Sequence, residues 1–249
     1  NQAFNALLFL FRNVWGKEPK GIDAVRARKP KRLPVVLTQD EVADVLEKTS
    51  GIRGLVLRVI YSSGLRLHEA LSLRVQDIDL KGPSLLVRGG KSNKDRVTIL
   101  SRRLIPFIRG HLEVQNVSFQ GEKIPASLPE ALERKYPNAG LEWNWQYVFP
   151  SEHASISTDT GEIRRHHIHP SCVQRAMREA VMESGISKHA TIHTLRHSFA
   201  THLLMSGVDI CEIQELLGHR NLETTRVYRQ DSTGLKPATT SPLNLLDEA

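Results

Sequence analysis

The amino-acid sequence predicts an α+β fold that is mainly α-helical and carries a small antiparallel β-sheet. Several segments space their apolar residues three and four positions apart, which places them on one face of a helix. Another segment alternates apolar and polar residues on either side of a polar turn, which is typical of a β-hairpin. The 249 residues are enough for one sizeable core with a smaller appendage.

Composition narrows the class of protein. A net charge of +7 and a sequence pI of 9.6 favour a polyanionic partner such as nucleic acid. Cys172 and Cys211 are too few for a disulfide framework and fit a reducing cytosol. No run approaches the roughly 20 apolar residues that span a bilayer, and the apolar residues 6–11 lack a signal-peptide cleavage region. We therefore expect a soluble cytoplasmic protein without a membrane partner.

Residues 1–15 are predicted to form one amphipathic helix. A single helix cannot bury an apolar face by itself. We interpret it as the last helix of an N-terminal domain whose beginning is absent; the alternative is an arm that packs on the main core. The apolar face consists of Phe4, Leu7, Leu8, Phe11 and Trp15.

Residues 17–34 are predicted to be a basic linker, because they carry seven Lys or Arg residues against only Glu18 and Asp23. Proline and glycine interrupt any regular element there. A basic segment can follow a phosphate backbone and release its counterions, so we expect DNA contacts; the alternative is a solvated linker. The expected contacts are Arg26, Arg28, Lys29, Lys31 and Arg32.

The globular pattern begins with a capping box at residues 38–41, which starts a helix. A second helix is expected over 52–62 and ends at Gly64. Arg66 then opens the next helix, with Glu69 one turn later. An arginine on a tight turn between apolar helices needs either a carboxylate partner or a bound anion. Because Glu69 could be that partner, both interpretations stay open at this point.

A β-hairpin is predicted around the polar turn at residues 89–95, with Val97 and Ile99 as the alternating apolar positions of its second strand. Lys91 and Lys94 lie on the turn. An ammonium group on a mobile hairpin can reach into a cleft and give a proton to a departing oxygen. The alternative is a hairpin tip that is simply solvated.

The middle of the chain is predicted to be helical at both ends and irregular between them. Helices are expected over 101–117 and 170–184, and residues 128–135 fit a short helix. Trp143 and Trp145 either pack on the core or offer a stacking surface for an unpaired DNA base.

Two histidine groups raise the question of a metal site. One lies within residues 166–169, and the other consists of His189, His193 and His197, which stand four residues apart. No cysteine or carboxylate stands at a closed zinc spacing around either group. We therefore predict no metal site and no cofactor.

The C-terminal third carries the residues best suited to chemistry on phosphate. His193 and Arg196 stand three apart at the start of a predicted helix and share one face. One apolar helical run then continues to Gly218, His219 follows directly, and Tyr228 ends a further short helix. A guanidinium offers paired donors for two phosphate oxygens, and a phenol beside cations can act as a nucleophile.

Five short motifs, in this order, resemble those of the tyrosine recombinases, the family of phage integrases and bacterial chromosome-dimer resolvases. The resemblance covers residues 35–231 and implies a tyrosine recombinase catalytic-domain fold. Within it, residues 121–150 look like the extra segment of integron integrases. The motifs are GLRLHE at residues 64–69, GKSNK at 90–94, HTLRHSFATH at 193–202, LLGH at 216–219 and TRVY at 225–228.

The resemblance implies a group of side chains that holds the scissile phosphate. Arg66 and Arg196 would bind its oxygens and offset the charge of the pentavalent transition state. His219 would donate a further hydrogen bond to a phosphate oxygen. Glu69 would support the two arginines from behind.

The resemblance also implies a nucleophile and two groups for proton transfer. Tyr228 would attack phosphorus and leave a 3′-phosphotyrosyl enzyme and a free 5′-hydroxyl. Lys91 would protonate the leaving oxygen, and His193 would assist proton transfer at the nucleophile. A 5′-hydroxyl from another strand would reseal the bond, so neither ATP nor a metal ion is needed.

The implied organisation is that of a recombinase of mobile genetic elements. Residues 1–34 would be the last helix of a core-binding domain plus the linker, and residues 232–249 a tail that fits either a docking helix or a frayed end. DNA is the expected partner, with the protein assembled on it as a tetramer. Integron integrases act on a folded single strand, so residues 121–150 are expected to contact its extrahelical bases during cassette integration and excision.

Two other functions remain open. A type IB topoisomerase-like enzyme would share the phosphotyrosyl chemistry but would not exchange strands. A DNA-binding module would bind DNA without chemistry, because nearly all of the N-terminal half of the DNA clamp is missing from the sequence. A suicide substrate separates the third function from the other two, and joining of two sites separates recombination from relaxation.

Overall fold

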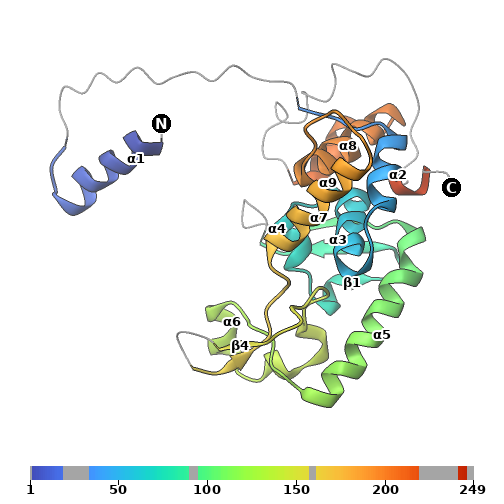
Figure 1. Ribbon diagram of the computed structural model, residues 1–249. Helices are drawn as coiled ribbons and strands as arrows, with labels where there is room; N and C mark the ends of the chain where they lie inside the picture. The colour runs from blue at the N-terminus through green and yellow to red at the C-terminus, as the bar shows by residue number, and fades with distance from the viewer. Residues whose placement is uncertain (1, 19–33, 90–94, 157–160, 219–240, 246–249) are drawn as a thin grey trace. The chain divides into compact units, whose positions relative to one another are not determined.

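The structure, a computed structural model, describes residues 2–18, 34–89, 95–156, 161–218 and 241–245 (Figure 1). The chain divides into two units, Asn1–Leu33 and Pro34–Ala249. Within the described ranges, no helix has both the length and the hydropathy that crossing a membrane would require.

The first unit contains the helix predicted for the N-terminus. Helix α1 covers Gln2–Phe9 and continues as the π-helix η1, Leu10–Val14. No residue of either helix is buried. The exposed apolar side chains of this unit include Leu7, Phe9, Val14 and Trp15.

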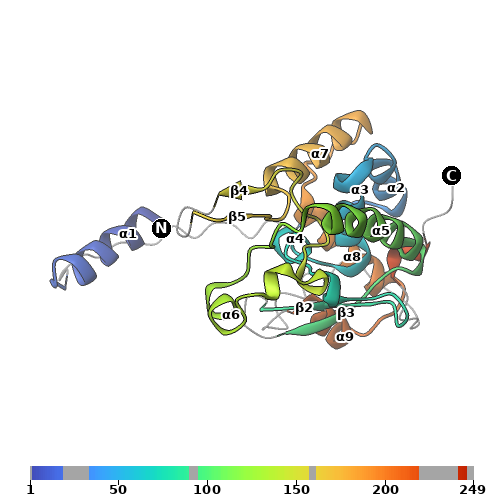
Figure 2. The same ribbon diagram turned by 90° about the horizontal axis from the view of Figure 1, so that it is seen from below.

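The second unit combines a group of helices with a three-stranded antiparallel sheet, so the predicted α+β class is confirmed (Figures 1 and 2). The sheet order is β1-β2-β3, and Figure 2 shows α9 beside β3. The α-helices are α2 (Gln39–Glu47), α3 (Gly51–Ser63), α4 (Leu67–Leu71), α5 (Ile105–Glu122), α6 (Glu130–Lys135), α7 (Pro170–Glu183), α8 (Ile192–Met205) and α9 (Ile210–Leu217). The strands are β1 (Ile78–Asp79), β2 (Ser84–Val87), β3 (Arg96–Ile99), β4 (Ser155–Ile156) and β5 (Ile163–Arg164), and the 3-10 helices are η2 (Val75–Asp77), η3 (Arg102–Leu104), η4 (Ala139–Leu141), η5 (Trp143–Trp145) and η7 (Pro242–Leu245).

Helix α3 is the centre of the core. Nine of its thirteen residues are buried, and it packs against α7 and α8. The capping box predicted at its neighbour α2 is present, because the Thr38 hydroxyl accepts from the Glu41 amide and Glu41 accepts from the Thr38 amide. Helix α3 ends where predicted, at Gly64, whose φ of 63° lies in the left-handed region. A Cβ atom at Gly64 would lie 2.5 Å from the ring of Phe199 and 2.9 Å from Leu217.

The close packing around Gly64 leads to a stability prediction. We expect Gly64→Ala to lower the free energy of unfolding by about 3 kcal/mol, because the new methyl group overlaps a core ring and the residue must keep a positive φ. Urea unfolding measures this loss. Gly110→Ala on α5 is the matched control, since its Cβ meets nothing within 4 Å and alanine favours a helix interior. Equal stability of the two variants would contradict the packing described.

The predicted single helical run after His193 is wrong, because the structure breaks it into α8 and α9. Gly207 adopts a φ of 86°, and the Val208 amide turns back to donate to the Leu203 carbonyl. Asp209 then caps α9 by accepting from the Cys211 amide at 2.7 Å. The break turns the end of α9 back toward α3, and this brings the Leu217 carbonyl within reach of α8.

The entry of the chain into the second unit is fixed on α8. The Leu37 amide donates to Ser198, and the Leu37 carbonyl accepts from Nε2 of His202 at 3.0 Å. Because a carbonyl only accepts, His202 carries its proton on Nε2 and its Nδ1 accepts from the Tyr61 hydroxyl at 2.8 Å. Burial lowers the pKa of His202, in keeping with a neutral ring.

The predicted hairpin is confirmed, and the structure shows which residues of its second strand face the core. Strands β2 and β3 pair with Val87 opposite Arg96. Arg96 and Thr98 face inward, whereas Val97 is 61% exposed. The strand β1 was not predicted, because two residues carry no readable alternation.

The segment between the hairpin and α7 differs from the prediction in two places. Helix α5 continues five residues past the expected end at 117 and stops only at Lys123, which has a φ of 46°. The pair β4–β5 was not predicted, since its four residues are short and largely exposed. The short helix expected over 128–135 is confirmed as α6, and the helix expected over 170–184 is confirmed as α7.

Candidate active site

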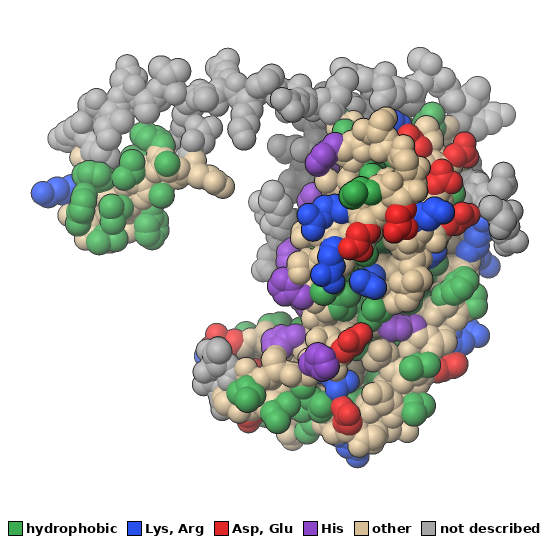
Figure 3. All heavy atoms as spheres, in the orientation of Figure 1, with side chains coloured by type: hydrophobic (Ala, Val, Ile, Leu, Met, Phe, Trp, Pro, Cys, Tyr) green, Lys and Arg blue, Asp and Glu red, His purple; other side chains and the backbone are tan. Residues whose placement is uncertain are grey.

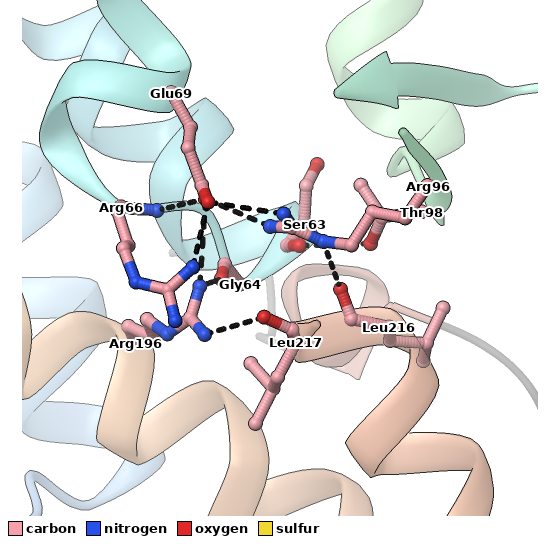
Figure 4. Close-up of polar contacts among 9 residues, drawn as sticks. All are labelled: Ser63, Gly64, Arg66, Glu69, Arg96, Thr98, Arg196, Leu216 and Leu217. Atoms are coloured by element: carbon pink, nitrogen blue, oxygen red, sulfur yellow. Dashed lines mark hydrogen bonds and ion pairs between the residues drawn. The ribbon is translucent and has the colours of Figure 1, made fainter. Parts of the chain in front are cut away.

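Glu69 is the centre of a group of three arginines, which we call the arginine cluster: Arg66, Arg96 and Arg196 around Glu69 (Figure 4). Arg96 makes a two-pronged contact, with Nη1 to Oε1 at 3.0 Å and Nη2 to Oε2 at 2.7 Å. Arg66 donates to Glu69 through Nη1 at 2.7 Å and through its backbone amide at 2.8 Å. Nη1 of Arg196 lies 3.5 Å from Oε2.

Arg196 is held by two helix ends. From α8, its Nη1 donates to the Gly64 carbonyl and its Nη2 to the Leu217 carbonyl, both at 2.6 Å. These carbonyls stand at the C-terminal ends of α3 and α9, where the helix dipole is negative and favours a cation. Only 5% of the Arg196 side chain is exposed. Its guanidinium is therefore fixed before any ligand arrives.

The arginine cluster keeps Glu69 ionised. Burial alone raises the pKa of Glu69, but hydrogen bonds from Arg96 and from the Arg66 amide, with the charges of Arg96 and Arg196, outweigh burial and lower it to about 2. Glu69 therefore does pair with Arg66, which is one of the two interpretations that the sequence left open. This pairing does not neutralise the whole cluster, because three guanidinium groups share one carboxylate.

Arg96 is the member of the cluster that sequence reasoning missed. The hairpin prediction rested on the apolar residues Val97 and Ile99 and gave Arg96 no role. The signal that could have found it is the register, because Val87 is 2% exposed and its partner across the hairpin must share its face. A charged residue on that buried face needs a partner, and Glu69 is the partner it has.

A cleft of about 510 Å³ opens beside the cluster. Arg66 and His193 line it together with Gln174, so the N-cap residue of α4 shares one space with side chains from α8 and α7. The side chain of Arg66 is 25% exposed, and His193 is exposed. The cleft thus presents a guanidinium and an imidazole to a ligand.

His197 lies one turn beyond His193 and is partly buried. Burial, reinforced by the charges of His193 and Arg196, lowers the pKa of His197 to about 4. His197 is therefore neutral near pH 7. Among the residues that the structure describes, no group of three or more His, Cys, Asp or Glu side chains could hold a metal ion.

The two tryptophans of residues 121–150 are partly buried and in contact with other rings and charges. Trp143 lies 5.7 Å from Phe119 between ring centroids. Arg88 lies over Trp145 at 5.9 Å, and Arg74 donates to the Trp145 carbonyl at 2.8 Å. Figure 3 shows hydrophobic side chains gathered over the lower part of its face, where α5 and α6 lie. Packing buries part of the surface of both tryptophan side chains, and the rest of each stays exposed.

Several predicted site residues lie outside the described residues. They share a position on the linker, on the hairpin turn or beyond Gly218. They are Arg26, Arg28, Lys29, Lys31, Arg32, Lys91, Lys94, His219 and Tyr228.

The chain matches known proteins over most of its length. The sequence profile of the phage integrase family matches residues 35–234. An integrase/recombinase of Escherichia coli is 42% identical over 232 residues, which cover 91% of this chain and 69% of that relative. The tyrosine recombinase XerA of Pyrococcus horikoshii is 33% identical over 205 residues, which cover 82% of this chain and 59% of that relative.

Solved recombinases share the fold. The crystal structure of XerA recombinase has a TM-score of 0.57 at 26% identity and covers 80% of this chain. XerH bound to its difH substrate has a TM-score of 0.60 at 21% identity and covers 91% of this chain, a likeness that bears on the fold alone. The match spans 61% of the XerA chain and 60% of the XerH chain. On the family profile and these relatives, the chain belongs to the phage integrase family of tyrosine recombinases.

Proposed function

We propose that this chain is the catalytic part of a site-specific recombinase that cleaves and rejoins DNA through a 3′-phosphotyrosyl intermediate. The observation that carries the proposal is the arginine cluster, which holds Arg66 and Arg196 against one carboxylate, with Arg66 lining an open cleft. Membership of the phage integrase family supports the same chemistry. The basic balance of the sequence supports DNA as the partner.

In this mechanism the arginines bind the scissile phosphate. Arg66 faces the cleft, and Arg196 is pinned at the Gly64 and Leu217 carbonyls. Groups that are already oriented toward developing charge need no reorganisation during the reaction, which is why they stabilise a pentavalent transition state well. His219 adds a hydrogen bond to a phosphate oxygen.

The remaining steps move protons and form the covalent bond. Tyr228 attacks phosphorus, and the 5′-oxygen leaves with a proton from Lys91. His193, which lines the cleft with Arg66, assists removal of the tyrosine proton. Attack by a 5′-hydroxyl reverses the chemistry and reseals DNA, so the bond energy is conserved without ATP or a metal ion.

Replacing Tyr228 with phenylalanine tests this proposal. We expect the wild-type chain to form covalent adducts with nicked duplexes from a random-sequence library, since the nick lets the short leaving strand diffuse away and traps the enzyme. Tyr228→Phe should bind the same duplexes and form no adduct, as seen on denaturing gels. Binding without adduct by the wild type would leave a DNA-binding module, and adduct without joining of two sites would favour a topoisomerase-like activity.

The finer proposal is an integron integrase that integrates and excises cassettes. The support is the run at residues 142–150, which resembles the extra segment of that group, and the exposed remainder of its two tryptophan rings. An exposed ring can stack on a base that is not paired. We propose that residues 121–150 contact the extrahelical bases of a folded single strand.

Joint replacement of Trp143 and Trp145 by alanine tests the finer proposal. We expect binding to a folded bottom-strand hairpin to weaken about tenfold or more, because stacking of each base is lost, while binding to a perfect duplex changes little. Duplex binding also reports that the variant is folded. Phe107→Ala, an exposed ring outside this segment, is the matched control. Equal losses on both DNAs would contradict the proposal.

The organisation of the whole protein is also proposed. Residues 1–34 would supply the last helix of a core-binding domain and a linker along the DNA, residues 35–231 the catalytic domain, and residues 232–249 a tail. The 3-10 helix η7 supports a tail that docks on the protein, because Leu243 is buried and the Ser241 hydroxyl donates to the Ser62 carbonyl at 2.7 Å. The protein would work in the cytoplasm as a tetramer on DNA.

A further inference from the structure

Arg96 is the arginine of the cluster whose side chain binds both carboxylate oxygens of Glu69. We propose that Arg96 is a positioning residue that neutralises Glu69, so that the full charges of Arg66 and Arg196 act on the scissile phosphate. The inference rests on the proposed function, because it concerns how the same site stabilises its transition state.

The hydrogen bonds of Arg96 all lead to the protein. Two nitrogens bind the Glu69 carboxylate, and Nε donates to the Leu216 carbonyl at 2.9 Å. Each of these three nitrogens contacts a protein oxygen, and the side chain is 11% exposed. Arg96 is therefore placed to act on Glu69.

The charges of the cluster explain what Arg96 contributes. Three guanidinium groups and one carboxylate leave two positive charges in a largely buried group. A phosphodiester carries one negative charge, and its pentavalent transition state carries two. Without Arg96, Glu69 would cancel one of the two remaining guanidinium charges, and one positive charge would face the dianion. Arg96 thus matches the cluster to the transition state more closely than to the ground state, which is the condition for catalysis.

Arg96 also holds the end of α9. Its Nε contact with Leu216 stands next to the Leu217 carbonyl that binds Arg196. A Cβ on Gly218 would lie 2.9 Å from Cδ of Arg96, so the left-handed turn after α9 is closed around the Arg96 side chain. Loss of this contact is a structural effect, and the experiment has to separate it from the loss of charge.

A set of variants separates the two effects. Arg96→Gln removes the charge and the two-pronged contact, and Arg96→Lys keeps the charge without the planar fork. The double variant Glu69→Gln with Arg96→Gln returns the cluster to two positive charges. Arg58→Gln is the matched control, since Arg58 also binds carbonyls at a helix end, those of Leu46 in the last turn of α2 and of Thr49 just after it.

The measurement compares cleavage rates on two nicked duplexes that differ at the scissile position, one with a phosphodiester and one with a methylphosphonate. The methylphosphonate is neutral and its transition state carries one negative charge. We expect Arg96→Gln to lower the rate ratio of phosphodiester to methylphosphonate by about 10- to 100-fold, the effect of one charge several ångströms away in a partly buried site. Arg96→Lys and the double variant should keep the wild-type ratio within about threefold, even where both rates fall, and Arg58→Gln should not change it.

A second measurement, of thermal stability in sulfate, does not depend on DNA cleavage. Sulfate, a dianion, should stabilise the wild-type chain against heat at lower concentrations than it stabilises Arg96→Gln, and the double variant should recover the wild-type response. If the wild type forms no adduct but this pattern appears, the proposed function fails and the charge role of Arg96 stands. An unchanged rate ratio in Arg96→Gln, or equal loss of sulfate stabilisation in Arg96→Gln and Arg58→Gln, would overturn the inference.

Discussion

Replacing Arg196 with lysine is expected to slow covalent cleavage of a nicked duplex by about 10³-fold. Loss of one preorganised donor at developing charge typically costs this much. Lysine cannot reproduce the planar fork with which Arg196 binds the Gly64 and Leu217 carbonyls at once. Single-turnover kinetics at saturating DNA measure the effect on the chemical step.

DNA binding separates this effect from misfolding. The affinity of Arg196→Lys for the same duplex should fall by much less than its cleavage rate, because the positive charge is kept. Arg134→Lys is the matched control, as Arg134 makes an exposed pair with Glu130 on α6. A slowing of less than about tenfold in Arg196→Lys would show that the fixed guanidinium is not needed for cleavage.

Replacing Glu69 with glutamine is expected to lower the free energy of unfolding by about 3 kcal/mol at pH 7. The size of this loss follows from the pKa of Glu69, which falls from its ordinary 4.5 to about 2 in the folded chain. The folded state therefore favours the ionised carboxylate. This contribution is fully present above pH 4.5 and is lost as the pH falls toward 2.

The pH dependence gives the test its specificity. Urea unfolding of the wild type and of Glu69→Gln should differ most between pH 5 and pH 7, and the difference should shrink by about 1.4 kcal/mol for each pH unit below 4.5. Glu130→Gln removes the exposed carboxylate paired with Arg134 and should change stability little at any pH. A difference between wild type and Glu69→Gln that does not change with pH would contradict the account.

The sequence predicted the parts of the fold and site that depend on local chemistry. The capping box at Thr38 and the left-handed glycine at Gly64 were readable because each is set by a few adjacent residues. The pairing of Arg66 with Glu69 was also within reach, since residues one helical turn apart share a face. Arg196 was predicted as a phosphate ligand from its motif, and this role stays a prediction.

The features that the sequence did not predict depend on distant partners. Arg96 binds residues 27 and 120 positions away, and no local pattern carries such contacts. The break between α8 and α9 depends on Gly207. A single glycine inside an apolar helical pattern does not by itself mark the end of a helix. The strands β1, β4 and β5 have two residues each, too few for alternation to appear. Tertiary context decides such elements.

The most direct test of the central claim is to identify the residue that becomes joined to DNA. Wild-type chain is trapped on a nicked duplex, the adduct is digested with protease and nuclease, and the modified peptide is sequenced by mass spectrometry. We predict a 3′-phosphate on Tyr228, with a free 5′-hydroxyl on the released strand. A phosphate on any other residue, or a 5′-phosphate joined to Tyr228, would contradict the account.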